Sequence, residues 1–345
     1  MSGVEGKRVL VTGATGFLGG AVAKALHAAG AHIVAHGRSA CAAADLERQG
    51  LEVWLSSLED RASVAAFLAK TPPELVVHSA ALSAPFGPRE AFVRSNVDAT
   101  ATVLEASERA GVTRFVHVST PAIYSSGRPL VSVREDATLP PRAINHYAAT
   151  KRIAESLVQS ANGRGLPTVI LRPRAIYGPG DRALFPRLVR ALEAGRLPII
   201  GDGRNRIDLT YIDDAVHGVE RALLAGEQAL GGVYNLTGPE PAALWEVIER
   251  LCVELDLPRP GRRVSHRAAR AAALAAETLH RLLRRKGEPA LTRYSVDSLA
   301  LDAGLDISAA RRDLGYRPSV TVDEGVRRFL ESLDDDRVAK EDGCP

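Results

Sequence analysis

The sequence predicts an α/β fold: a doubly wound parallel sheet with a smaller C-terminal lobe. Short β-branched runs alternate with Ala- and Leu-rich helical stretches over about the first 160 residues. The runs are almost continuously apolar, which is typical of parallel strands covered by helices on both faces. A glycine-rich turn also joins the first apolar run directly to the first helical stretch.

The elements follow in order along the chain. Six apolar runs are expected to form strands: Arg8–Thr12, His32–His36, Glu52–Leu55, Leu75–His78, Arg114–Ser119 and Thr168–Leu171. Apolar residues recur at helical spacing in Leu18–Ala29, Ala42–Arg48, Ala62–Ala69 and Phe92–Ala110. Further helices are expected at Phe185–Ala194, Asp213–Leu224 and Leu244–Glu254, and a return to the sheet near Gly232–Leu236.

These elements divide the chain into two parts. Residues 1–174, with a return segment at about 207–237, are assigned to the sheet domain. Residues 175–206 and 238–333 are assigned to a substrate-binding lobe, because Pro and Gly become frequent there. The charged end, residues 334–345, is expected to be a flexible tail.

Composition excludes several classes of protein. The 345 residues carry 44 basic and 41 acidic side chains, a balance that argues against a nucleic-acid binder. No long uncharged apolar run predicts a membrane span, and the start resembles a strand rather than a secretory leader. Cys41, Cys252 and Cys344 lie far apart without CxxC spacing, so neither disulfides nor a metal site are expected, and a reducing cytoplasm fits best.

The glycine-rich turn predicts a dinucleotide-binding (Rossmann) domain. Gly13 permits the tight turn, Gly16 lets a pyrophosphate approach the backbone, and Gly19 lets the helix press against the strand. The phosphates are then expected at the positive end of the helix dipole. The other turn residues expected to contact the cofactor are Thr15, Phe17 and Leu18.

Arg38 predicts which dinucleotide binds. It ends the second expected strand, where NAD-binding folds usually place an acidic residue that binds the ribose 2′-hydroxyl. A carboxylate would repel a 2′-phosphate, whereas a guanidinium binds it with charge-assisted hydrogen bonds. We therefore expect NADP(H) to be preferred over NAD(H).

Tyr147 and Lys151 form the main candidate for catalysis. Positions four apart share one face of a helix, so the phenol and the ammonium are expected to face one cleft. The ammonium and a positive nicotinamide ring would both favour the phenolate. Tyr147 is then expected to exchange a proton with a substrate oxygen, and Lys151 to bind the nicotinamide ribose.

Ser119 and Thr120 end another expected strand. Hydroxyls at the carboxyl end of a parallel strand lie in the ligand crevice. We expect Thr120 to bind the substrate oxygen, with Ser119 in support.

Together these residues resemble the extended short-chain dehydrogenase/reductases. Matching stretches include TGATGFLG (12–19), HSAA (78–81), LRP (171–173), IYGPG (176–180) and YIDD (211–214). The resemblance implies that Asn96 steadies the active-site backbone and that Arg172 and Pro173 line the nicotinamide end. It also implies cofactor contacts at Leu58 and Ala80. Ser57 departs from the family, which commonly has Asp there in contact with adenine.

Within the family, the chain resembles the 3β-hydroxysteroid dehydrogenase-like branch, and in particular the bacterial 2-alkyl-3-oxoalkanoate reductases of long-chain olefin biosynthesis. The stretches are STPAIY (119–124), YAATKRIAE (147–155), GDGRNRIDLTYIDD (201–214) and GEPALTRY (287–294). This resemblance implies NADPH-dependent reduction of a β-keto acid with two long alkyl chains, a hydrophobic small-molecule substrate. Arg174 or Arg206 is a candidate to meet the carboxylate.

Three alternatives remain open. A steroid or sterol 3-dehydrogenase belongs to the same branch, and a nucleotide-sugar 4-epimerase would use the same Tyr147 and Lys151. A non-catalytic dinucleotide sensor would keep the fold without turnover. Dehydration of a sugar is not expected, because Pro121 and Ala122 follow Thr120 where sugar dehydratases generally have Asp-Glu.

The basic segment 262–286 completes the set of expectations. Arginines flank an apolar helical stripe that is expected to pack on the second lobe: Val264, Ala268, Ala271, Ala272, Ala275, Leu279, Leu282 and Leu283. The alternative is a helix that contacts anionic lipid or a partner enzyme. The family resemblance also implies a homodimer paired through the helices around Phe92–Ala110 and Tyr147–Ala161.

Overall fold

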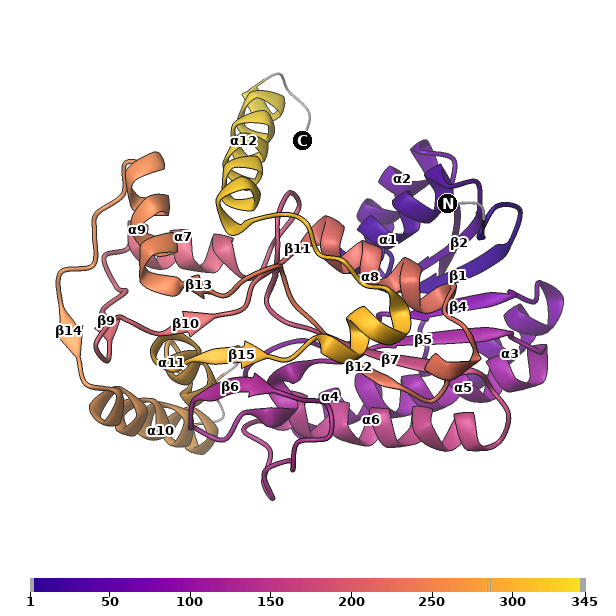
Figure 1. Ribbon diagram of the computed structural model, residues 1–345, viewed down its shortest axis with the longest axis horizontal. Helices are drawn as coiled ribbons and strands as arrows, with labels where there is room; N and C mark the ends of the chain where they lie inside the picture. The colour runs from indigo at the N-terminus through magenta and orange to yellow at the C-terminus, as the bar shows by residue number, and fades with distance from the viewer. Residues whose placement is uncertain (1–2, 284, 286, 342–345) are drawn as a thin grey trace.

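The computed structural model describes residues 3–283, 285 and 287–341. Its centre is a seven-stranded sheet in which every neighbouring pair is parallel. From one edge to the other the strands are β12 (Val233–Leu236), β7 (Thr168–Pro173), β5 (Arg114–Val118), β4 (Leu75–His78), β1 (Arg8–Thr12), β2 (His32–Gly37) and β3 (Glu52–Leu55). The predicted doubly wound sheet is thus confirmed (Figure 1).

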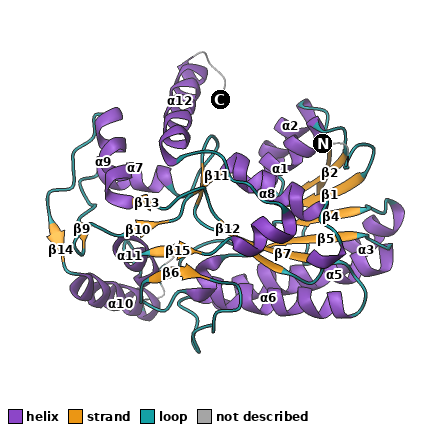
Figure 2. Cartoon of the chain, viewed as in Figure 1, coloured by secondary structure: helices purple, strands orange, loops and turns teal. Residues whose placement is uncertain are grey.

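Helices cover both faces of this sheet (Figure 2). One face packs against α1 (Phe17–Ala28), α2 (Ala40–Arg48) and α8 (Ile212–Leu223). The other packs against α3 (Arg61–Lys70), α5 (Ala99–Ala110) and α6 (His146–Gly163). The short α4 (Arg89–Phe92) and the π-helical η1 (Val93–Asp98) lead into α5, so the helix predicted from Phe92 is continuous but changes pitch.

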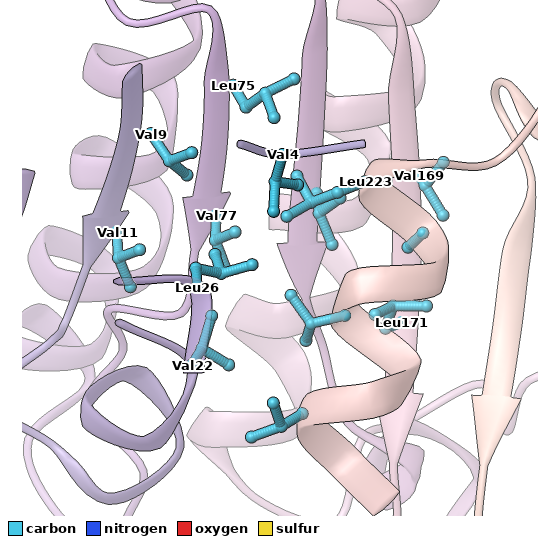
Figure 3. Close-up of a cluster of buried hydrophobic side chains, with 14 of the residues drawn as sticks. Val4, Val9, Val11, Val22, Leu26, Leu75, Val77, Val169, Leu171 and Leu223 are labelled. Atoms are coloured by element: carbon cyan, nitrogen blue, oxygen red, sulfur yellow. The ribbon is translucent and has the colours of Figure 1, made fainter. Parts of the chain in front are cut away.

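The side chains of each strand alternate between two cores. Val9 and Val11 of β1 face α1, whereas Leu10 between them joins the core under α3 and α5. Figure 3 shows the first of these cores, where Val22 and Leu26 of α1 lie over the strands. Since both faces are buried, the strands need apolar residues at successive positions, which explains the continuous runs in the sequence.

The smaller lobe is built from short strands and peripheral helices. Its strands are β6 (Leu130–Val133), β8 (Ile176–Tyr177), β9 (Ile199–Ile200), β10 (Arg206–Ile207), β11 (Thr210–Tyr211), β13 (Ala242–Ala243), β14 (Arg263–Val264) and β15 (Ala303–Leu305). Its helices are α7 (Phe185–Glu193), α9 (Leu244–Glu254), α10 (His266–Leu282), α11 (Arg293–Ala300) and α12 (Val322–Glu341). Short helical turns occur at η2 (Pro121–Tyr124), η3 (Glu227–Ala229) and η4 (Ala310–Leu314).

Two expectations for this lobe differ from the structure. The apolar stripe of segment 262–286 does not pack inward apart from Val264, which is half-buried, because α10 faces the lobe with Ala269, Ala273, Glu277 and His280. Of that segment, residues 284 and 286 lie outside the described part. The helix α12 continues to Glu341, into the segment expected to be a tail, and residues 342–345 are not described.

Candidate active site

The turn between β1 and α1 accepts only glycine at two positions. Gly13 has a φ of +73°, and a Cβ there would lie 2.9 Å from the backbone of Ala80. A Cβ on Gly19 would lie 2.3 Å from the carbonyl oxygen of Gly13. The turn is therefore closed against larger side chains by its own backbone and by the end of β4.

The first turn of α1 suits an anion. The helix begins after Gly16 with no side-chain cap and no acidic residue in its first turn, which holds Phe17, Leu18 and Gly19. The positive end of the helix dipole therefore faces the glycine turn without a competing carboxylate. A phosphate group fits this position.

A cavity of about 210 Å³ opens beside this turn. Six residues expected to bind the cofactor line it: Gly13, Thr15, Gly16, Arg38, Leu58 and Ala80. Ser57, the departure from the family pattern, lies in the same wall. The uncapped helix and this cavity fit the adenosine diphosphate half of a nicotinamide dinucleotide.

Arg38 is the positive charge of this cavity. It is exposed in the cavity wall, and nearby His36 is buried. Burial, with the charge of Arg38, lowers the pKa of His36 to about 4, so that this imidazole is neutral at pH 7. Of these two side chains, only the guanidinium then carries a charge that can attract a phosphate.

Tyr147 lies in the first turn of α6, which Asn145 caps by accepting a hydrogen bond of 2.8 Å from the backbone N–H of Ala148. Burial raises the pKa of Tyr147, while hydrogen bonding with Ser83 and Thr120 acts in the opposite direction. The phenol is therefore protonated at neutral pH and lies near hydroxyl groups from the loop after β4 and from the end of β5. A protonated phenol in this position can serve as a proton donor.

Lys151 bonds to β5 rather than to the phenol. Its Nζ donates a 2.6 Å hydrogen bond to the carbonyl of Val118 and lies 3.0 Å from Nε2 of His117. Burial lowers the pKa of Lys151 to about 8, and burial with the charge of Lys151 lowers that of His117 well below its usual value. An ammonium that donates to a neutral imidazole is the consistent state at pH 7. Within the described residues, no hydrogen bond joins Lys151 to Tyr147.

Ser119 and Arg172 belong to a buried network below the site. The hydroxyl of Ser119 donates a 2.5 Å hydrogen bond to Glu155. Arg172 binds both carboxylate oxygens of Glu155, at 2.8 and 2.6 Å, and also donates to the hydroxyl of Tyr124. The guanidinium of Arg172 is therefore held by Glu155 and Tyr124, and Pro173 is the last residue of β7. Their expected place along the nicotinamide end stays a prediction.

Asn96 fixes the loop that follows β4. Its side chain accepts a hydrogen bond of 2.7 Å from the backbone N–H of Leu82 and donates one of 3.1 Å to the carbonyl of the same residue. It also donates to the hydroxyl of Thr150 on α6, at 3.1 Å. The segment carrying Ser83 is thereby held against the helix carrying Tyr147.

Three residues of the site were missed in the sequence. Glu155 follows Lys151 by four positions, so helical spacing already placed it on the same face as Tyr147. Ser83 lies shortly after an expected strand end, the position at which hydroxyls were sought elsewhere. His117 carried no signal, because an alternating apolar run gives no reason to single out one buried imidazole.

A second cavity, of about 340 Å³, opens at the start of α6. Asn145 and His146 line it together with Phe86, Arg281, Arg293 and Tyr294. Tyr294 also influences the pKa of Tyr147, whose neighbours His146 and Ala149 line the cavity. It provides space for a substrate between the sheet domain and the smaller lobe.

The two arginines considered for a substrate carboxylate differ in position. Arg206 donates to the carbonyl of Pro241 at 2.6 Å and is exposed. Arg174 directly follows β7 and is half-buried, near Tyr294 and Asp208, and burial lowers its pKa. Arg174 is thus close to Tyr294, a residue of the second cavity's wall.

Two kinds of feature are absent from the described residues. No group of three or more His, Cys, Asp or Glu side chains is arranged to hold a metal ion. No helix in the described ranges is long and apolar enough to cross a membrane.

Comparison with known proteins identifies the family of the chain. The model of the NAD dependent epimerase/dehydratase family matches residues 9–237. The chain is 35% identical over 336 residues to the 2-alkyl-3-oxoalkanoate reductase of Stenotrophomonas maltophilia (strain K279a), covering 94% of this chain and 99% of that protein. It is 35% identical over 272 residues to 3beta-hydroxysteroid-dehydrogenase/decarboxylase isoform 1 of Arabidopsis thaliana, covering 75% of this chain and 62% of that one.

A solved structure shows the same architecture. The dTDP-glucose 4,6-dehydratase from Streptomyces venezuelae, with NAD bound, superposes with a TM-score of 0.76 at 26% identity, over 96% of this chain and 98% of that one. The family resemblance predicted from the motifs is confirmed by these matches. The chain therefore belongs to the NAD dependent epimerase/dehydratase family, the extended short-chain dehydrogenase/reductases, and is an NAD(P)-dependent oxidoreductase.

Proposed function

We propose that this protein uses NADPH to reduce a ketone on a bulky hydrophobic substrate to a secondary alcohol, with a 2-alkyl-3-oxoalkanoate as the substrate. The observation that carries the proposal is the phenol of Tyr147, which burial keeps protonated and which is hydrogen-bonded with Thr120. Its neighbours on α6, His146 and Ala149, line the 340 Å³ cavity. The 35% identity to a 2-alkyl-3-oxoalkanoate reductase over nearly the whole chain supports the substrate class.

The residues divide the work as follows. Gly13, Gly16 and Gly19 admit the pyrophosphate, and Arg38 binds the 2′-phosphate. When bound, the dinucleotide supplies the hydride. Thr120 and Tyr147 bind the ketone oxygen, and Tyr147 donates its proton to that oxygen.

Lys151 positions the cofactor and does not donate the proton to the substrate. Its ammonium, held by Val118 and His117, would bind the hydroxyls of the nicotinamide ribose. Ser119 supports the end of β5 through Glu155. Arg174 is the guanidinium we assign to the carboxylate of the keto acid, since Arg206 is engaged at the surface.

The oxidation of NADPH that depends on added substrate tests the proposal, and it is followed by the loss of absorbance of the reduced nicotinamide. A long-chain 2-alkyl-3-keto acid should be reduced, and a 3-ketosteroid and a UDP-sugar should not. The steroid is the second candidate, favoured by the match to the Arabidopsis 3beta-hydroxysteroid-dehydrogenase/decarboxylase. Turnover of the steroid or the sugar in place of the keto acid would refute the substrate assignment.

Tyr147→Phe tests the proton donor. Loss of a positioned general acid should lower kcat by about 10²–10⁴-fold and leave the Kd for NADPH nearly unchanged. Tyr211→Phe is the matched control, because this buried tyrosine packs in the smaller lobe's core. Full activity of Tyr147→Phe would show that another group donates the proton.

We also propose that two copies pair through α5 and α6. Ile153 on α6 is 45% exposed, so this helix presents a large apolar side chain to water. Light scattering on the purified protein should give the mass of a dimer, and Ile153→Glu should lower it to that of a monomer. A wild-type protein with the mass of a monomer would refute the proposed pairing.

A further inference from the structure

The outer face of α10 is apolar and uncovered. Leu274, Leu279, Leu282 and Leu283 are 47%, 52%, 75% and 52% exposed. The alanines between them, such as Ala271 and Ala275, are exposed as well. Figure 1 shows α10 at the outer edge of the smaller lobe. Except for Val264, the stripe predicted to be buried is therefore a surface of the molecule.

Exposed arginines accompany this surface. Five arginines in and around α10 are exposed: Arg262, Arg263, Arg267, Arg281 and Arg285. The sequence from 262 to 286 contains one acidic residue, Glu277. That carboxylate is buried, bound by Arg293 at 2.9 and 3.0 Å and paired with Arg281 at 3.5 Å, so it leaves the other four exposed arginines without an acidic partner from this segment.

The inner face of the same helix borders the substrate cavity. Glu277 and Arg281 line the 340 Å³ cavity. The ring of His280 packs edge-on against Phe86 at 5.2 Å, and the guanidinium of Arg281 lies 5.3 Å from the centre of that ring. One helix thus separates the cavity from the exposed leucine surface.

We propose that the outer face of α10 binds an anionic lipid surface, with the helix lying parallel to it. Leucines on one face and arginines at its edge are the pattern of helices that lie in the membrane interface. Exposed arginines would be attracted to anionic headgroups, while the leucines enter the boundary of the acyl chains. The proposal stands without the proposed function; if that function also holds, the cavity opens next to the source of long-chain substrates.

Charge argues against a second copy as the occupant. Pairing this face with itself would bring the exposed arginines of both copies together with no exposed carboxylate from either α10. Like charges brought together at an interface oppose association. An anionic lipid surface would attract the arginines and would also accept the apolar side chains.

Flotation with lipid vesicles tests the proposal on the full chain. The protein is mixed with vesicles of phosphatidylcholine alone or with about one third phosphatidylglycerol. We expect at least about tenfold stronger partitioning to the anionic vesicles, weakened by added salt because the attraction is screened. Equal partitioning to both vesicles, or no binding to either, would overturn the proposal.

Paired variants assign the binding to this face. Leu279→Ser with Leu282→Ser should weaken partitioning by about tenfold or more, since two apolar side chains no longer enter the interface. Arg267→Gln with Arg285→Gln should weaken it by a similar factor, at about fivefold per charge. The control, Val131→Ser with Val253→Ser, removes two exposed apolar side chains elsewhere and should leave partitioning unchanged.

All variants change exposed side chains, and an unchanged Tm checks that each remains folded. Equal loss in the control and the leucine pair would overturn the assignment to α10. Light scattering covers the remaining occupant: if the leucine pair converts an oligomer to a monomer and vesicles are not bound, the face is a contact between copies and the proposal is wrong.

Discussion

The buried charge of Lys151 should lower the free energy of unfolding at pH 7. The side chain is 2% exposed, and burial lowers its pKa from 10.5 to about 8. Below pH 8 the folded state must keep an ammonium away from water. That penalty disappears as the pH rises from 8 to 10.5, because the folded state then releases the proton before the unfolded chain does.

The magnitude follows from the shift. A difference of about 2.5 pKa units corresponds to about 3.4 kcal/mol at pH 7, since each unit is worth about 1.36 kcal/mol. By pH 10 the unfolded chain has also begun to lose the proton, and about 2.5 kcal/mol of the penalty has been relieved. Lys151→Met removes the charge and also leaves the Val118 carbonyl without its 2.6 Å partner, a loss that does not vary with pH.

Urea unfolding measures this difference through the fluorescence of Trp54 and Trp245. The free energy of unfolding of Lys151→Met, relative to wild type, should fall by about 2.5 kcal/mol between pH 7 and pH 10. The pKa of His117 lies below this range, so its titration does not interfere. Lys70→Met, at an exposed position ending α3, is the control. If the difference in free energy of unfolding between Lys151→Met and wild type stays constant with pH, the ammonium is not buried in solution.

Three further predictions concern the cofactor turn and the network below it. Arg38→Asp should raise the KM for NADPH by about tenfold or more and lower that for NADH, since a charge-assisted hydrogen bond is worth about 1.5–3 kcal/mol; an unchanged NADPH/NADH ratio in steady-state kinetics would place 2′-phosphate recognition elsewhere. Gly19→Ala puts a Cβ 2.3 Å from the Gly13 carbonyl and should lower the free energy of unfolding by about 1–3 kcal/mol and weaken NADPH binding. Gly163→Ala, with nothing within 4 Å of its Cβ, is the control for calorimetry and fluorescence titration, and an equal effect of both would contradict the packing argument. Arg172→Met should cost about 3–5 kcal/mol in urea unfolding because Glu155 stays buried without its partner, and the double variant with Glu155→Met should lose less; additive losses would show that the two side chains do not interact.

Much of the fold could be predicted because the local and the global signals agree. The strand β1 and the helix α9 were predicted with the bounds that the structure has. The run in β1 is continuously apolar, as in a strand buried on both faces, and apolar residues recur at helical spacing in α9. The return of β12 to the sheet followed from one short apolar run. By contrast β6 and β15, which pair with each other, are short and distant in the chain, so neither has a local pattern that identifies its partner.

Side-chain partners were harder to predict than elements. Helical spacing placed Tyr147 and Lys151 on one face, but the choice of Lys151 between the phenol and the Val118 carbonyl depends on how closely α6 approaches β5. The stripe on α10 shows the same limit, because periodicity identifies an apolar face without identifying what covers it. The motif placed Arg172 near the site. The direction of its guanidinium depends on Glu155, a residue on another element to which it donates a hydrogen bond.

The order of the strands also determines how long a ligand must be to use the whole site. Arg38 follows β2 and Thr120 follows β5, with β1 and β4 between them. At about 4.8 Å per step, three steps separate the two strand axes by about 14 Å. A mononucleotide at the glycine turn would leave one end of this span empty, whereas two nucleotides joined through their phosphates can reach both ends. Discrimination by overall length is therefore built into the spacing of the backbone, before any side chain selects a base or a ribose.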